Sequence, residues 1–264
     1  MSAILRVADL RKAYAGVHAL DGVSFDVAAG SITGLIGPNG SGKSTAIDCV
    51  SGFQKLDDGQ VVLAGIDITG RPSHLIARAG LMRTFQTVRI YERLSLRDNL
   101  AIAAQQFDEA TFVDEFFRTR RYREAVEASE MRARELVELI GLGKYYEIET
   151  GILSYGQKKL VALASALMPR PKIVVLDEPV AGVNPSRIRE IEAALQQLNR
   201  AGETFLIVEH NVEFITNLCD HVLVLEQGRL LAEGAPKTIR TDARVLDAYL
   251  GRERQAERDP AGLQ

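Results

Sequence analysis

Short apolar runs, which predict β-strands, alternate along the chain with segments whose apolar residues recur at helical spacing. This alternation is typical of an α/β fold with a mainly parallel core sheet, here with an antiparallel β part at the N-terminus. Strands are expected at Ile4–Leu10, Gly22–Val27, Ile32–Ile36, Val61–Ala64, Leu81–Phe85, Ile173–Leu176, Thr204–Val208, Val222–Leu225 and Arg229–Ala232, the last two as a hairpin. Helices are expected at Thr45–Val50, Pro72–Ala79, Ser154–Met168, Pro185–Asn199, Val212–Leu218 and Ala243–Leu250.

The stretch from Ser95 to about Ile140 differs from the rest of the chain. It is rich in Ala, Glu, Arg and Leu, and its apolar residues follow helical spacing throughout. We interpret it as an inserted helical subdomain that ends at Gly141 and Gly143. The apolar positions at this spacing include Met131, Leu136, Leu139 and Ile140.

The composition is typical of a globular protein. Of 264 residues, 46% are hydrophobic and 25% are charged, and the net charge is −3 with no basic block, so nothing favours nucleic-acid binding. No apolar stretch predicts a signal peptide or a membrane span. Cys49 and Cys219 lie within apolar patterns, so we expect buried thiols rather than a disulfide, as in a reducing cytoplasm.

The segment GPNGSGKST, Gly37–Thr45, fits the phosphate-loop pattern G-x-x-x-x-G-K-[ST]. It follows a predicted strand and opens a predicted helix, which is the context the motif requires. Its glycines allow backbone N–H groups to form an anion nest, and the helix N-terminus adds partial positive charge. A Gly-rich turn could match by chance, but the flanking strand and helix favour a nucleoside triphosphate site. The expected phosphate-binding residues are Gly37, Pro38, Asn39, Gly40, Ser41, Gly42, Lys43, Ser44 and Thr45.

A second candidate is IVVLDEP, Ile173–Pro179, where a buried strand ends in two acids. Carboxyl ends of parallel strands are where α/β sheets bind ligands. Asp177 is expected to hold Mg²⁺ together with the Ser44 hydroxyl, and Glu178 to accept a proton from the attacking water. The alternative is a pair of exposed acids at a strand end, which becomes less attractive beside a phosphate loop.

The third candidate is LSYGQ, Leu153–Gln157, in which Ser154 and Gln157 have the spacing of a helix capping box. A capped helix N-terminus with a hydroxyl and a glycine is also an anion site. Here the chain resembles the ATP-binding subunits of ABC transporters, whose signature is LSGGQ. The resemblance covers about residues 3–251, with the motifs in the family's order.

The resemblance implies a role for each matching residue. Tyr14 would stack on adenine, Gln86 would contact Mg²⁺ and the attacking water and relay nucleotide state to the membrane partner, and His210 would touch the γ-phosphate. Taken alone, Tyr14 would more often be a strand-edge tyrosine, Gln86 a surface amide and His210 a structural histidine. Catalytic roles fall to Glu178, His210, Gln86 and Lys43, metal binding to Ser44, Gln86 and Asp177, and nucleotide binding also to Tyr14, Ser154, Gly156 and Gln157.

The family's architecture implies one ATP-binding domain over residues 1–251. Its RecA-like core would span 1–88 and 169–251, its helical subdomain about 89–168, and the charged tail 252–264 would be disordered. In this family the signature of one subunit completes the phosphate site of another. The resemblance therefore implies a head-to-tail dimer, of identical chains or with a second ATP-binding subunit, that encloses two ATP molecules and drives membrane subunits.

Two positions depart from the family's pattern. Tyr155 replaces the first glycine of the signature and adds bulk beside the γ-phosphate. Asn184, in the Gly182–Pro185 loop that links the two sites of a dimer, replaces an aspartate, a change expected to weaken coupling. Neither change removes a phosphate ligand or the proposed base, so an active ATPase is expected.

Three features, RTFQTVRIYERLSLRDNL, LSYGQ and DAYLG, are similar to the larger ATP-binding subunit of branched-chain amino acid importers, a group that also serves related amides. This similarity implies that the chain works with permease subunits and a periplasmic binding protein. It also implies a peripheral position on the cytoplasmic side of the inner membrane. The alternative within the family is the ATPase of lipopolysaccharide export. Outside transport, an ABC protein acting on DNA or the ribosome and a P-loop kinase are alternatives that the motif set disfavours.

Overall fold

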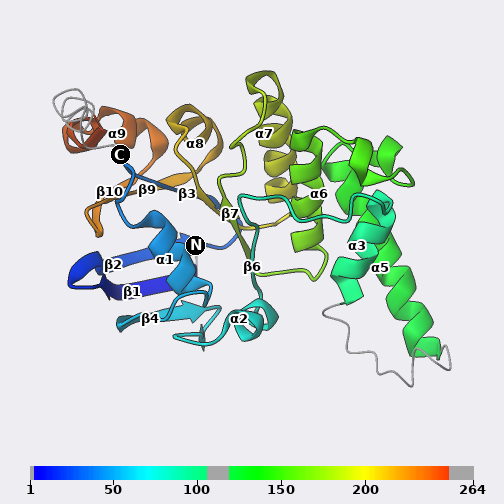
Figure 1. Cartoon of the computed structure of the whole chain (residues 1–264), viewed down its shortest axis with the longest axis horizontal. Coiled ribbons are helices and arrows are strands. Elements are labelled where there is room, and N and C mark those ends of the chain that lie inside the picture. The colour runs from blue at the N-terminus through cyan, green and yellow to red at the C-terminus, as the bar shows by residue number, and fades with distance from the viewer. Residues whose placement is uncertain (1–2, 106–118, 250–264) are drawn as a thin grey trace. The chain divides into compact units, whose positions relative to one another are not determined.

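The structure is a computed structural model that describes residues 3–105 and 119–249 (Figure 1). The chain divides into two compact units, Met1–Ala79 with Thr204–Gln264 and, between them in sequence, Gly80–Glu203. The predicted helical subdomain at 89–168 falls within the second unit, and its limits stay a prediction. The tail predicted to be disordered, 252–264, lies outside the described residues.

The first unit contains an antiparallel sheet in the order β2-β1-β4-β5. Its strands are β1 (Ala3–Tyr14), β2 (Val17–Ala28), β4 (Asp58–Leu63) and β5 (Ile66–Asp67). The β1–β2 hairpin turns at Ala15 and Gly16, which both have positive φ, as the tight hairpin turns that match strand twist require. The predicted antiparallel N-terminal part is confirmed.

The first unit also contains strands in the order β10-β9-β3-β8, in which β3 pairs in parallel with both β8 and β9. All five residues of β3 (Ile32–Ile36) and all four of β8 (Phe205–Val208) are buried, as expected for parallel strands covered on both faces. The strands β9 (His221–Glu226) and β10 (Arg229–Gly234) form the predicted hairpin.

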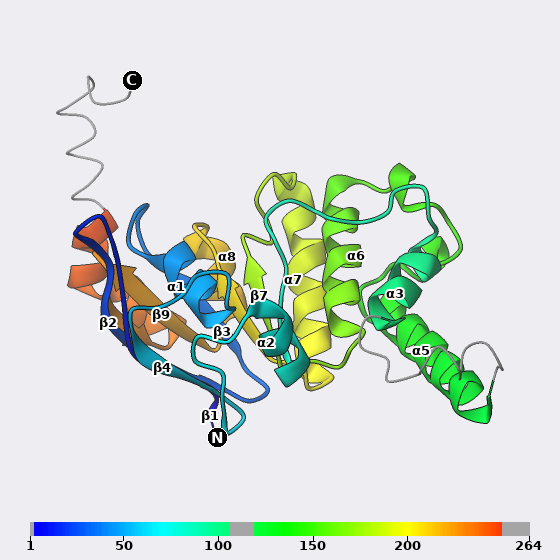
Figure 2. The ribbon, with the colours of Figure 1, turned by 60° about the horizontal axis from the view of Figure 1, so that its bottom comes forward.

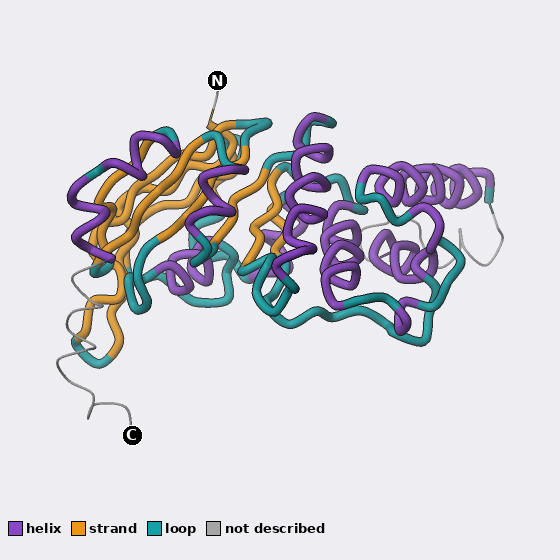
Figure 3. The backbone as a smooth tube through the Cα atoms, turned by 90° about the horizontal axis from the view of Figure 1, so that it is seen from above, coloured by secondary structure: helices purple, strands orange, loops and turns teal. Residues whose placement is uncertain are grey.

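Short helices accompany these strands (Figure 1). They are α1 (Lys43–Val50), α2 (Ser73–Ala79), α8 (Val212–Leu218) and α9 (Pro236–Thr241), followed by helical residues 243–249. The paired strands lie side by side in the tube view (Figure 3). Strands β3 and β8 are parallel neighbours, paired from Ile32 with Phe205 to Leu35 with Val208. The segments that follow them therefore leave the sheet at the same edge.

The second unit joins a pair of parallel strands to a group of helices. The strands are β6 (Leu81–Arg83) and β7 (Ile173–Asp177). The helices are α3 (Leu96–Gln105), α5 (Arg120–Leu139), α6 (Tyr155–Leu167) and α7 (Pro185–Arg200), with short 3-10 turns at Gly143–Tyr145 and Thr150–Ile152. Helix α6 packs against α3, α5 and α7, and α6 and α7 run side by side (Figure 2).

One detail of the helical pattern was wrong. Met131, taken as an apolar position of the helical stretch, is 66% exposed, whereas Arg132 beside it is buried. The guanidinium of Arg132 pairs with Glu203 and Glu135, which allows a charged residue to take a buried place. The buried stripe of α5 therefore runs through Arg132, Ala133, Leu136 and Val137.

The mixed α/β fold class is confirmed, as is the prediction of two buried thiols. Burial raises the pKa of Cys49 to about 11 and raises that of Cys219 further, because the thiolate would lose its hydration. Among the helices in the described ranges, none combines the length and apolar character needed to cross a membrane.

Candidate functional site

The phosphate loop lies in the first unit, between the buried end of β3 and the first turn of α1. Gly37, Gly40 and Gly42 have φ of 150°, 74° and 102°. A Cβ at Gly37 would lie 2.2 Å from the carbonyl oxygen of Leu225, and one at Gly42 would lie 2.5 Å from that of Ala19. Both the backbone conformation and the close packing therefore require glycine at these positions.

Lys43, the first residue of α1, is 4% exposed, and its side chain folds back over the loop. Its Nζ donates to the carbonyl oxygens of Gly37 and Pro38, at 2.7 and 3.0 Å. Gly42 precedes the helix and has no side chain to cap it, and the first turn carries no acidic residue. An ammonium group and the positive end of a helix thus face the same concave loop, an arrangement that fits the phosphates of a nucleotide.

His210 leaves the sheet at the same edge as the phosphate loop, because β8 and β3 are parallel neighbours. The turn is held by Glu209, which is 3% exposed and whose Oε2 accepts from the backbone N–H groups of His210 and Asn211. Asn211 in turn caps α8. The structure therefore brings His210 and the phosphate loop to one edge of one sheet.

Tyr14 ends β1 at the turn of the β1–β2 hairpin and is 44% exposed. The ammonium of Lys12 lies 5.4 Å from the centre of its ring. Strand β2 of the same hairpin supplies Ala19, whose carbonyl oxygen packs against Gly42 of the phosphate loop. An exposed aromatic ring on a hairpin that touches the phosphate loop could stack on a base.

The remaining predicted site residues lie in the second unit. Asp177 is the last residue of β7, and Glu178 follows it with φ of 49°, in the left-handed region. A non-glycine residue held there is strained by about 1–3 kcal/mol, and such strain clusters at functional sites. The carbonyl oxygen of Glu178 accepts from Lys159 Nζ at 2.7 Å, a charged hydrogen bond that stabilises the turn.

The end of β6 and the segment after it contact both carboxylates. An Nη2 atom of Arg83 donates to Oδ2 of Asp177 at 2.9 Å, and Nε2 of Gln86 donates to Oε2 of Glu178 at 2.7 Å. The structure therefore brings Gln86 to Glu178, the residue after Asp177.

The start of α6 is built by the signature-like segment. Ser154 Oγ accepts from the backbone N–H of Gln157, and Gln157 Oε1 accepts from the N–H of Ser154, so the predicted capping box is confirmed. Gly156 lies in the first turn, where an added Cβ would meet Val183 at 3.3 Å. The turn carries no acidic residue, which leaves a helix N-terminus suited to an anion.

Tyr155 and Asn184, the two residues that depart from the family pattern, both contact neighbouring residues. The Tyr155 hydroxyl reaches the carbonyl oxygen of Gln86 at 3.5 Å, and its ring packs close to Gly182. Asn184 caps α7, because its Oδ1 accepts from the backbone N–H and the hydroxyl of Ser186 at 3.0 and 2.9 Å. The cap is a role in which asparagine and aspartate are equivalent.

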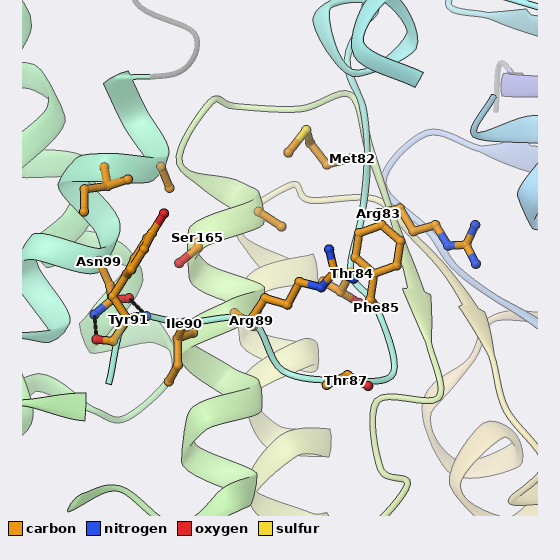
Figure 4. Close-up of a pocket in the computed structure, with 14 residues that line it drawn as sticks. Met82, Arg83, Thr84, Phe85, Thr87, Arg89, Ile90, Tyr91, Asn99 and Ser165 are labelled. Atoms are coloured by element: carbon orange, nitrogen blue, oxygen red, sulfur yellow. Dashed lines mark hydrogen bonds between the residues drawn. The ribbon is translucent and has the colours of Figure 1, made fainter. Parts of the chain in front are cut away.

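A pocket of about 400 Å³ opens next to Gln86 in the second unit (Figure 4). Its walls are residues 82–85, 87 and 89–91 and faces of α3 and α6. Asn99, 5% exposed, fixes one side by bonding both the N–H and the carbonyl oxygen of Tyr91. Phe85 and Tyr91 are 38% and 58% exposed, so the pocket presents aromatic surface to solvent.

Three of these contacts are invisible in the sequence: those of Arg83 with Asp177, Lys159 with Glu178 and Asn99 with Tyr91. Each joins segments whose spatial neighbours the motifs do not specify. Arg83 sits in the RTFQ string, three residues before Gln86, and only the β6–β7 pairing brings it to the end of the neighbouring strand.

The described residues can supply only part of the coordination shell of a Mg²⁺ ion. Within the described part of the chain, no three His, Cys, Asp or Glu side chains gather into a metal site. Mg²⁺ commonly binds one or two carboxylates together with phosphate oxygens and waters, so the carboxylate of Asp177 suits it as a ligand.

Two family models match this chain. The ABC transporter family model matches residues 20–181, more than half of the chain. The chain belongs to the ABC transporter family. A second model, the branched-chain amino acid ATP-binding cassette transporter, matches residues 229–254.

Individual relatives extend over almost the whole chain. It is 35% identical over 249 residues to the high-affinity branched-chain amino acid transport ATP-binding protein BraF of Pseudomonas aeruginosa, covering 94% of this chain and 98% of that protein. It is 38% identical to a probable LivG of Archaeoglobus fulgidus, covering 94% and 95%. The crystal structure of the ADP conformation of an ATP-binding cassette of an ABC transporter matches with a TM-score of 0.81 and 36% identity, covering 95% and 100%.

Proposed function

We propose that the chain is the ATP-binding and ATP-hydrolysing subunit of an ABC importer for branched-chain amino acids or related amino acids and amides. The observation that supports ATP binding best is the phosphate loop, where buried Lys43 and the glycine backbone face one concave surface. Support for the cargo comes from relatives named for branched-chain amino acid transport and from the C-terminal match at residues 229–254.

In this proposal the first unit holds the nucleotide. Backbone N–H groups of Gly37–Thr45 bind the phosphates, and Tyr14 stacks on the base. Lys43 exchanges its carbonyl acceptors, Gly37 and Pro38, for β- and γ-phosphate oxygens. His210, at the same edge of the sheet, contacts the γ-phosphate.

The second unit supplies the base. Glu178 accepts a proton from the attacking water, while Gln86 and Lys159 hold its carboxylate and its carbonyl group in place. Ser44, Asp177 and Gln86 would hold Mg²⁺, which when bound neutralises charge on the β- and γ-phosphates. No covalent intermediate on the protein is needed, because phosphoryl transfer relies on positioning and electrostatic stabilisation.

The start of α6 completes the site in a partner subunit. Ser154, Gly156 and Gln157 offer a hydroxyl and backbone N–H groups at a helix N-terminus with no acid in its first turn. We propose that they bind the γ-phosphate held by an opposing ATP-binding subunit, either a second copy or a different chain. Two ATP molecules would then be enclosed in each dimer.

The pocket beside Gln86 is the proposed site for the permease. Its exposed aromatic residues, Phe85 and Tyr91, suit a partner segment with apolar side chains. Gln86 lies between the lining residues Phe85 and Thr87 and bonds Glu178, so occupation of the pocket could be coupled to the base. The chain would lie on the cytoplasmic side of the inner membrane, with a periplasmic binding protein delivering the cargo.

Two experiments test this function. The purified chain should release phosphate from ATP without any phosphoryl acceptor, and Lys43→Met should abolish nucleotide binding. Consumption of ATP only with an added acceptor would instead indicate a kinase. A tagged chain pulled down from membranes should bring two hydrophobic permease subunits, and its loss should abolish uptake of labelled leucine. Loss of lipopolysaccharide export, with uptake intact, would favour the alternative transporter.

A further inference from the structure

We infer that Arg83 is a positioning residue that serves as the resident counter-ion of Asp177, so that a metal ion arriving at this carboxylate competes with a guanidinium. The inference rests on the proposed function, because it concerns the same Mg²⁺·ATP site. It assigns a role to a residue that the motifs leave unexplained, and it predicts that Arg83 lowers the metal affinity of the site.

The ion pair is built by strand pairing. In the parallel pair of β6 and β7, Arg83 is in register with Val175, and the next backbone N–H, that of Thr84, donates to the Val175 carbonyl oxygen at 3.0 Å. The last residue of β6 therefore lies beside the end of β7. Its guanidinium reaches Oδ2 of Asp177 at 2.9 Å.

Because the pair is buried, each of its charges depends on the other for compensation. The side chains of Arg83 and Asp177 are 8% and 17% exposed, so neither charge is well hydrated. A charge in such a place needs a partner, and removal of one partner leaves the other uncompensated. Only Oδ2 takes a hydrogen bond within the described residues, which leaves Oδ1 to a further cation.

A second cation at Asp177 would be repelled by the guanidinium. Two positive charges that share one carboxylate lie within a few ångströms of each other, where screening by water is incomplete. Arg83 should therefore weaken metal binding, and metal binding should loosen Arg83. The carboxylate stays paired in either condition, which avoids an isolated buried charge.

Release of Arg83 from Asp177 would loosen one wall of the pocket. Arg83 and Gln86 attach the two ends of one four-residue segment to Asp177 and Glu178. The first three residues of this segment line the pocket. Arg83 also lies over the Phe85 ring, at 5.5 Å from its centre. Figure 4 shows its guanidinium directed away from Tyr91 and Asn99, on the far side of the Phe85 ring. Loss of one attachment should make the wall more mobile.

The test measures binding of Mn²⁺, as a paramagnetic substitute for Mg²⁺, in the presence of a non-hydrolysable ATP analogue. Free Mn²⁺ is followed by electron paramagnetic resonance. Arg83→Met removes the charge, Arg83→Gln removes the charge but keeps a hydrogen-bond donor, and Arg83→Lys keeps the charge. Arg89→Met is the matched control, because Arg89 lies over the same Phe85 ring but forms no ion pair in the described part of the chain.

Arg83→Met and Arg83→Gln should bind Mn²⁺ at least fivefold more tightly than the parent, while Arg83→Lys and Arg89→Met should stay within twofold. Unchanged or weaker binding in both uncharged variants would overturn the inference. If these variants do not fold, hydrogen exchange in the parent protein tests the inference instead. Adding Mn²⁺ to the nucleotide-bound parent should speed hydrogen exchange in residues 84–91, and unchanged exchange would also overturn it. Absence of nucleotide-dependent Mn²⁺ binding in the parent would refute the proposed function instead.

Discussion

Substitutions of Ser154 can separate its structural role as a helix cap from its proposed role in phosphate binding. Its hydroxyl caps α6 by accepting from the N–H of Gln157, and a serine N-cap contributes about 1 kcal/mol to stability. Ser154→Ala should therefore lower the free energy of unfolding by about 1 kcal/mol. Ser154→Asp should not, because aspartate caps as well as serine and its charge suits a helix N-terminus.

The two substitutions should differ in the opposite way in catalysis. A carboxylate placed about 5 Å from a γ-phosphate charge costs about 3 kcal/mol at an effective dielectric constant of about 20, which corresponds to on the order of a hundredfold in rate. Ser154→Asp should therefore be stable but lose ATP hydrolysis about a hundredfold, whereas Ser154→Ala should be less stable but lose less activity.

The assays are urea unfolding followed by circular dichroism and steady-state phosphate release. Thr119→Ala is the matched control, because Thr119 caps α5 through the N–H of Tyr122 and has no proposed contact with nucleotide. It should lose stability as Ser154→Ala does and keep its activity. If Ser154→Asp hydrolyses ATP within twofold of the parent, Ser154 does not face a phosphate, and the role proposed for the start of α6 is wrong.

Three further predictions follow from local geometry. Gly42→Ala should lose nucleotide binding and about 1–3 kcal/mol of stability, more than the control Gly30→Ala, since an added Cβ would clash at Gly42 and meets open space at Gly30. Lys159→Met should lower kcat about tenfold with little change in KM, because it frees the Glu178 turn. Cys49 should resist thiol reagents at pH 8, and its contribution to stability should fall between pH 9.0 and about 11, where only the unfolded thiol ionises.

Elements with strong local signals could be predicted from the sequence. Helix α8 has the predicted bounds, Val212–Leu218, because Asn211 supplies a cap before its apolar face. The capping box at Ser154 was visible for the same reason. Strand β1 was predicted to end at Leu10 but continues to Tyr14. Its last four residues, of which Arg11 and Lys12 are charged, pair with β2 but show no apolar alternation.

The contacts that organise the site could not be predicted in this way. Motif spacing locates Asp177 at a strand end, but the neighbour of that strand is a matter of sheet order, so the bond from Arg83 stays hidden. Burial of Arg132 has the same origin, because its partner Glu203 is distant in sequence. The turn at Glu178, with its positive φ, accepts a hydrogen bond from the Lys159 side chain, a contact that no local pattern reveals.

The central proposal is that two chains close over the same ATP, with Glu178 as the base. Its most direct test is the mass of the Glu178→Gln variant, measured by light scattering with and without ATP. The account predicts a monomer without nucleotide, a stable dimer holding two unhydrolysed ATP molecules when ATP is added, and no dimer when Ser154→Asp is added to the same chain. A variant that hydrolyses ATP at the parent's rate would contradict it. So would a variant that binds ATP and dimerises neither with itself nor with a second ATP-binding subunit.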